Sequence, residues 1–107
     1  MIFCKIDNNL IEIIKKYAGK RAIVDVGCGD GLLGSMLEGV ISIDLFPKET
    51  ALIPNIIEMD AVDFPFSRPF FPVFIRPCHG NFVWRVMEMH KNNVDNFLYI
   101  SMPHNLE

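Results

Sequence analysis

The residues whose types and spacing could do chemistry lie closest together in segment 23–31, whose sequence is IVDVGCGDG. The acidic residue Asp25 stands two positions before the first of three alternating glycines, Gly27, Gly29 and Gly31. Glycine tolerates positive φ and has no Cβ, so a ligand can lie directly on the backbone amides of such a loop, with the positive end of a following helix behind it. The segment therefore predicts a binding site for an anionic or polar ligand.

The flanking residues predict the elements that hold this loop. The apolar run before the glycines contains β-branched residues and predicts a strand over 23–26, whereas residues 32–37 have helical spacing. A second apolar run over 40–44 predicts a buried parallel strand that ends at Asp44. A carboxylate at the end of this strand can accept hydrogen bonds from the two hydroxyls of a ribose.

Two classes of ligand compete for the glycine loop. Segment 29–34 also matches the dinucleotide fingerprint, in which three glycines receive a pyrophosphate. Asp25 would repel a diphosphate, however, and would attract a cation. Asp44 follows Gly27 by 17 residues and Gly29 by 15, which is nearer than the roughly 20 residues of the dinucleotide pattern. Both observations favour a ligand that carries positive charge.

Segment 25–31, DVGCGDG, resembles the first motif of the class I S-adenosylmethionine-dependent methyltransferases at every position. The resemblance implies a Rossmann-like fold and S-adenosylmethionine as cofactor, because the methionine end of that cofactor carries an ammonium and a sulfonium. It also implies that Asp60, after the third strand, receives the adenine amino group, with the amide of Ala61 or Val62 beside it. The cofactor-binding residues so implied are Asp25, Gly27, Cys28, Gly29, Gly31, Asp44, Asp60 and Ala61.

The rest of the chain predicts a single α/β domain over 1–107. A doubly wound, mainly parallel sheet of strand order 3-2-1-4-5 is expected, with the ligand at the carboxyl ends of strands one and four. Segment 64–72 has three prolines and four phenylalanines and is expected to be an extended aromatic loop. The remaining expected elements are helices over 9–19 and 81–91 and strands over 56–59, 73–75 and 97–100.

The resemblance also implies a reduced form of the family's fold that lacks its terminal hairpin. One sheet face and one edge would then be poorly covered, so we expect a homo-oligomer or a partner protein. After the fourth strand, many family members that methylate DNA or protein amides have Asn or Asp followed by Pro-Pro-Tyr or Pro-Pro-Phe, and this chain instead has the sequence RPCH. His79 is the candidate catalytic base there, and Arg76 and Cys78 are candidate substrate contacts.

Composition excludes several other classes. The formal net charge is −3 with interspersed signs, so a nucleic-acid partner is not indicated. The three cysteines are widely separated and odd in number, which indicates a reducing compartment, and no metal-ligand spacing is present. No uncharged run approaches the ~18 residues of a membrane span. We expect a cytoplasmic protein.

Three functions follow as hypotheses. The first is a methyltransferase that transfers a methyl group from S-adenosylmethionine to an unknown acceptor. The second is a degenerate methyltransferase-like domain that acts as a binding or regulatory subunit. The third, a minor alternative, is a nicotinamide-dependent oxidoreductase.

Overall fold

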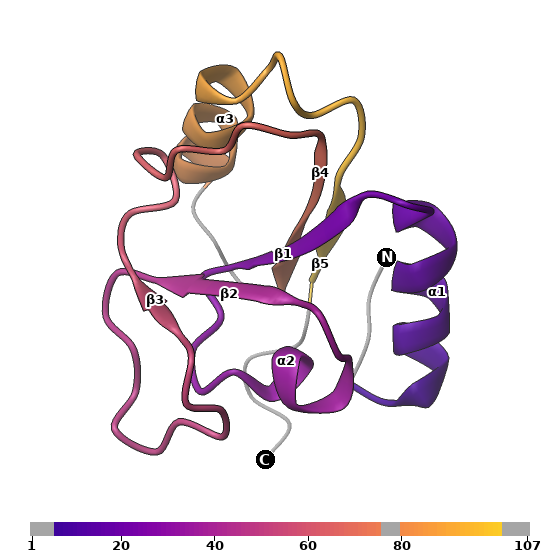
Figure 1. Cartoon of the computed structure of the whole chain (residues 1–107), viewed down its shortest axis with the longest axis vertical. Coiled ribbons are helices and arrows are strands. Elements are labelled where there is room, and N and C mark those ends of the chain that lie inside the picture. The colour runs from indigo at the N-terminus through magenta and orange to yellow at the C-terminus, as the bar shows by residue number, and fades with distance from the viewer. Residues whose placement is uncertain (1–5, 76–79, 102–107) are drawn as a thin grey trace.

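The computed structural model describes residues 6–75 and 80–101 and has a five-stranded parallel sheet at its centre (Figure 1). The strand order β3-β2-β1-β4-β5 confirms the predicted α/β topology, and each neighbouring pair is parallel. The strands are β1 (Ala22–Val26), β2 (Ile41–Asp44), β3 (Ile57–Glu58), β4 (Phe70–Ile75) and β5 (Leu98–Ile100). The helices are α1 (Asn8–Ala18), α2 (Leu32–Met36) and α3 (Gly80–Met89).

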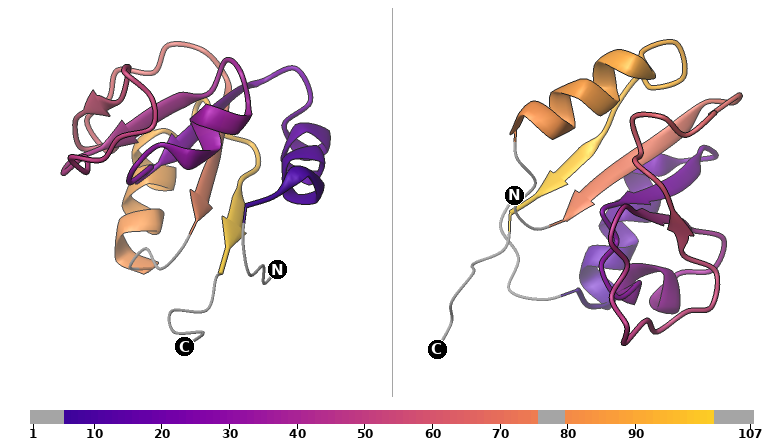
Figure 2. Two further views of the ribbon diagram at one scale, coloured as in Figure 1. Left: turned by 90° about the horizontal axis from the view of Figure 1, so that it is seen from below. Right: turned by 90° about the vertical axis from the view of Figure 1, so that its left-hand side faces the viewer.

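Helices lie on opposite faces of the sheet (Figure 2). On the first, here called the α1 face, Leu10 and Ile14 of α1 and Leu33 of α2 pack in a cluster with alternate residues of β4. On the second, the α3 face, Val86 of α3 packs in a cluster with Val24 and other strand residues. Each face therefore carries a buried cluster among the described residues. Within the described ranges, no helix is long and apolar enough to cross a membrane.

The structure corrects the start of the fourth strand. The sequence placed Phe70 and Pro72 in a loop, but β4 begins at Phe70 and Pro72 pairs in register with Val24 of β1. Proline is tolerated at position 72 because the backbone N–H that it lacks would point toward β5, where the pairing has not yet begun. The amide of Phe70, two residues earlier, donates to Asn93 O on the β5 side, and pairing with β5 starts only at Val73. Pro72 thus removes no bond of the ladder.

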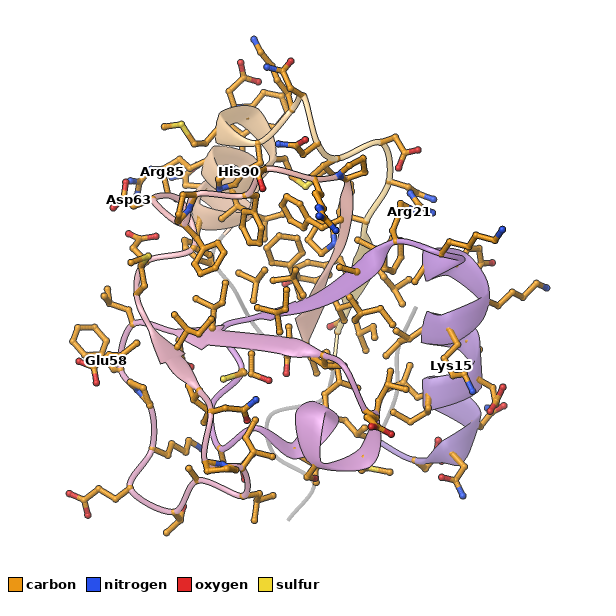
Figure 3. The ribbon with its side chains drawn as sticks, viewed as in Figure 1. Lys15, Arg21, Glu58, Asp63, Arg85 and His90 are labelled. Atoms are coloured by element: carbon orange, nitrogen blue, oxygen red, sulfur yellow. The ribbon has the colours of Figure 1, made fainter. Side chains whose placement is uncertain are left out.

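The aromatic residues before β4 have a packing role. Phe66 stacks on Phe70 with ring centroids 3.8 Å apart, and Phe64 lies beside Phe66 at 4.5 Å. His90, just after α3, meets Phe66 edge to face and hydrogen-bonds through Nε2 to Ala61 O at 2.8 Å. In Figure 3, His90 lies toward the interior of the molecule, whereas Arg85 lies nearer the periphery. These contacts fix segment 61–66 on the α3 face.

Candidate functional site

The glycine loop and Asp44 form one hydrogen-bonded unit at the carboxyl ends of β1 and β2. The amides of Gly27 and Cys28 both donate to Ile43 O, at 2.8 and 3.0 Å. The amide of Gly29 donates to Asp44 Oδ2 at 2.7 Å, and Asp44 Oδ1 accepts from the amide of Phe46 at 2.8 Å. The two strongest sequence signals are therefore joined directly, at the sheet edge where a doubly wound fold binds its ligand.

Segment 48–56 packs against the glycine loop. Gly31 has φ 84°, and a Cβ added there would lie 2.7 Å from Cγ1 of Ile53. The amide of Leu52 donates to Asp30 O at 2.7 Å. Positive φ at Gly27, Gly29 and Gly31, which the sequence suggested, is observed in all three. At Gly31, glycine is thus required both by the backbone conformation and by the side chain that packs on it.

The glycine amides of this loop are donated within the protein. Besides the bonds of Gly27 and Gly29, the amide of Gly31 donates to Cys28 O at 3.0 Å. The start of α2 is also occupied, because the amide of Leu32 donates to Asp30 Oδ1 at 3.1 Å. The sequence led us to expect a ligand lying directly on these glycine amides, and the structure instead pairs them internally. A pyrophosphate would meet paired amides and a carboxylate here, which disfavours a dinucleotide.

The electrostatics of the loop favour a cation. The pKa of Asp25 is raised to about 7, mainly by burial and to a smaller extent by the nearby carboxylates of Asp44 and Asp30. Among the described residues, no Lys, Arg or His forms an ion pair with any of these three acids. Lys48 is the basic residue nearest the loop in the described contacts, with Cε 3.9 Å from where a Cβ on Gly29 would lie. The acids thus form a cluster that lacks a positive charge paired to it.

Asp25 and Ser42 are two buried polar groups that lie side by side. They are register partners in β1 and β2 and are 3% and 2% exposed. Ser42 Oγ has no hydrogen-bond partner among the described residues. Within the described ranges, no hydrogen bond involves the Asp25 carboxyl group either. Leaving a buried hydroxyl unpaired costs about 1–3 kcal/mol, so the unpaired Ser42 at this edge of the sheet calls for an explanation.

Cys28 is placed in the loop as a neutral thiol. Its pKa is raised to about 12, mainly by burial and to a smaller extent by the charges of Asp25 and Asp44. Because the thiolate is the reactive form, Cys28 is poorly suited to act as a nucleophile. Its contribution to a cofactor site would be its backbone and its small apolar volume.

Asp60 and Ala61 lie beyond β3 at the same edge, and the structure gives both a local role. Met59, just before them, donates its amide to Asp44 O at 3.2 Å. Asp60 Oδ1 accepts from the amide of Val62 at 2.9 Å, so that amide is already donated within the turn. Ala61 is buried in the cluster of the α3 face. Both residues are thus used in shaping the turn, which leaves their predicted role with adenine to be tested.

The acceptor-side predictions, Arg76, Cys78 and His79, lie outside the described residues. Within the described ranges, no group of three or more His, Cys, Asp and Glu side chains could hold a metal ion. Sequence reasoning missed Ser42, although a signal was available. In a strand predicted to be buried on both faces, Ser42 is the polar residue among the apolar residues Val40, Ile41 and Ile43 that precede Asp44.

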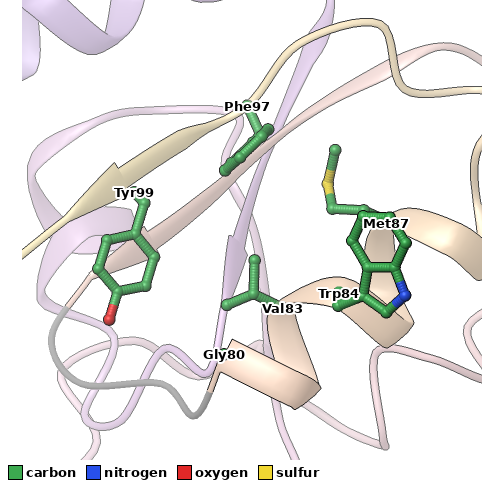
Figure 4. Close-up of a pocket in the computed structure, with 6 residues that line it drawn as sticks. All are labelled: Gly80, Val83, Trp84, Met87, Phe97 and Tyr99. Atoms are coloured by element: carbon green, nitrogen blue, oxygen red, sulfur yellow. The ribbon is translucent and has the colours of Figure 1, made fainter.

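A second feature is an apolar hollow between α3 and β5 (Figure 4). Its volume is about 320 Å³, and it is lined by Gly80, Val83, Trp84, Met87, Phe97 and Tyr99. Trp84 is 68% exposed, which is unusual for the largest apolar side chain. Exposed aromatic surface of this kind is typical of a contact region.

Comparisons of this chain with protein-family models, with curated proteins and with solved structures find no match. The parallel α/β fold and the geometry of the site therefore carry the functional proposal.

Proposed function

We propose that the carboxyl edge of β1 and β2 binds S-adenosylmethionine, as the cofactor for methyl transfer to an acceptor whose identity is open. The observation that supports this most is the acid cluster around the glycine loop, in which buried Asp25 has no partner among the described residues. A ligand with an ammonium and a sulfonium supplies the positive charge that this cluster lacks.

The remaining hydrogen-bonding capacity at the edge fits a ribose. Each oxygen of Asp44 accepts one backbone amide, from Gly29 or Phe46. A carboxylate has about four lone-pair sites, so Asp44 retains acceptor capacity for two hydroxyl groups. The two amide bonds also fix the orientation of the carboxylate before the ligand arrives, which lowers the entropy cost of binding.

When bound, the cofactor would supply an electrophilic methyl group. The residues of this chain would then bind the cofactor, orient it and exclude water, because an in-line displacement depends mainly on close alignment. A base is needed only if the acceptor carries a proton at neutral pH. His79 is proposed for that role, and Arg76 and Cys78 for contacts with the acceptor, because they directly follow β4 in the sequence.

A binding or regulatory subunit is the second candidate function. The hollow beside Trp84 and Phe97 favours it, because a contact region with a second copy or a partner protein would cover these exposed side chains. Such a subunit would bind the cofactor without turnover. A nicotinamide-dependent oxidoreductase is disfavoured, because the amides of Gly29 and Gly31, two glycines of the dinucleotide fingerprint, are already donated within the protein.

Calorimetric titration with S-adenosylmethionine, S-adenosylhomocysteine and NAD tests this proposal. We expect micromolar binding of the first two ligands and none of NAD. Asp44→Asn should weaken binding at least tenfold, and the exposed Asp63→Asn, which makes the same charge change away from the glycine loop, should leave it unchanged. Absence of S-adenosylmethionine binding to folded protein would refute the proposal, and preferential binding of NAD would support the oxidoreductase instead.

A further inference from the structure

Ser42 has an unusual position among the buried polar groups. Among the described residues, Ser42 Oγ is the only fully buried side-chain oxygen or nitrogen without a hydrogen-bond partner. Gly34 of α2 packs against this hydroxyl, since a Cβ added to Gly34 would be 2.8 Å from Ser42 Oγ. The backbone of α2 thus covers the hydroxyl, and Gly34 has no side chain that could form a hydrogen bond with it.

Asp25 is the polar neighbour of Ser42. Val24, Val26 and Ile43 belong to the cluster on the α3 face. Because side chains alternate along a strand, Asp25 and Ser42 point together to the opposite, α1 face. They are register partners on adjacent strands, which lie about 4.8 Å apart, so the two side chains are direct neighbours on this face.

The other groups around Asp25 leave Ser42 as its available neutral donor. The charged groups that raise the pKa of Asp25 are Asp44 at the end of β2 and Asp30 in the loop, and both are acidic. Cys28 is a neutral thiol whose Sγ lies 3.9 Å from Gly29 O, and exposed Lys48 forms no ion pair in the described ranges. The helices on this face contribute apolar side chains to its cluster, namely Leu10, Ile11, Ile14 and Ala18 of α1 and Leu33 of α2.

We propose that Ser42 is a positioning residue for Asp25, which donates a hydrogen bond to the ionised carboxylate, and that a cationic ligand at the glycine loop binds with release of the Asp25 proton. The carboxyl group is neutral and buried at low pH. When the cation arrives, the proton leaves to solvent, and the carboxylate is stabilised by the ligand on one side and by Ser42 on the other. The second half of this proposal rests on the proposed function, and the first half does not.

The first half is tested on the ligand-free protein by following the carboxyl carbon of Asp25 by NMR as a function of pH, with Asp25→Asn used to assign the signal. A hydrogen bond to a charged group favours the charged form, so Ser42→Ala should raise the titration midpoint of Asp25 by about one pH unit. Ser35→Ala is the matched control, because Ser35 is exposed and its hydroxyl donates to Leu32 O. It should leave the midpoint unchanged.

An unchanged midpoint in Ser42→Ala would overturn the role of Ser42. If that variant fails to fold, Ser42→Cys keeps the approximate volume and weakens the donor, and it should shift the midpoint in the same direction by a smaller amount. A midpoint in Ser42→Cys equal to that of the unmodified protein would equally overturn the role.

The second half is tested by calorimetry with S-adenosylmethionine at pH 6.5, in two buffers of different ionisation enthalpy. We expect release of more than half a proton per ligand, because the pKa of Asp25 lies near 7 in the free protein. Asp25→Asn should release none. Binding without proton release would overturn this half, and an absence of binding would refute the proposed function while the result for Ser42 stands.

Discussion

The two faces of the sheet bury polar groups in different ways. On the α3 face, His90 is 7% exposed, and its Nε2 donates to Ala61 O while its ring meets Phe66 and Phe70. On the α1 face, Asp25 and Ser42 are more deeply buried, at 3% and 2% exposed, and Ser42 Oγ has no hydrogen-bond partner among the described residues. A satisfied buried group holds two segments together, whereas an unsatisfied one lowers stability. The contacts of His90 hold segments of the α3 face together, and the unpaired hydroxyl on the α1 face is in keeping with the proposed binding role of its loop end.

The largest effect is expected for Asp25→Asn, which removes the buried ionisable group without changing its size. The folded protein holds the pKa of Asp25 at about 7, above its ordinary value of 3.8, so the folded state binds more protons than the unfolded state between these two values. The stability of the unmodified protein should therefore fall, relative to the variant, as the pH rises from about 4 to about 7, and then stay low.

The size of that change between pH 4 and pH 8 should be roughly 4 kcal/mol, at about 1.4 kcal/mol for each unit of pKa shift. Urea denaturation of both proteins at pH 4 and pH 8 measures it. A difference in free energy of unfolding that is the same at both pH values would show that Asp25 is not buried in its neutral form.

Next in size is His90→Ala on the α3 face. Loss of the bond to Ala61 O and of the ring contacts with Phe66 should lower the free energy of unfolding by about 2–3 kcal/mol. His90→Phe keeps a ring and should lose about 1 kcal/mol. Lys91→Ala, which removes an exposed ion pair with Glu88, should lose less than about 0.5 kcal/mol. Equal losses in His90→Ala and Lys91→Ala would contradict a packing role for His90.

The smallest difference separates Gly31→Ala from Gly39→Ala. Both glycines have nearly the same φ, 84° and 85°, but an added Cβ would meet Ile53 at Gly31 and open space at Gly39. The backbone strain is common to both, at about 1–2 kcal/mol, so Gly31→Ala should be worse by about 1 kcal/mol. In an Ile53→Ala background, adding Gly31→Ala should no longer show that excess, as thermal unfolding of Gly31→Ala, Gly39→Ala, Ile53→Ala and the double variant can show. If the excess remains, Ile53 does not pack on the loop.

The sheet could be predicted from the sequence because the apolar runs are short and the glycine loop marks the first crossover. The strand order followed from the connections and is confirmed. The start of β4 could not be predicted, since Pro72 reads locally as a strand breaker. Its place is allowed by a tertiary feature, namely that β5 begins only opposite Val73.

The candidate site was predictable in its members and less so in its hydrogen bonds. The sequence brought Asp25, the glycines and Asp44 to one edge, and the structure places them there. It could not show that the loop amides are donated to Ile43 and Asp44, because those partners belong to another strand. The unpaired hydroxyl of Ser42 depends likewise on the register of β1 and β2 and on the approach of Gly34.

The central claim is that the acid cluster on the α1 face binds a cationic adenosine cofactor. Titration of the unmodified protein and of Asp25→Asn with S-adenosylmethionine at pH 8 tests it most directly, because the variant is expected to be the more stable of the two and a loss of binding cannot then be ascribed to unfolding. We predict micromolar binding to the unmodified protein and at least tenfold weaker binding to Asp25→Asn. Equal binding by both, or none by the folded unmodified protein, would contradict the claim.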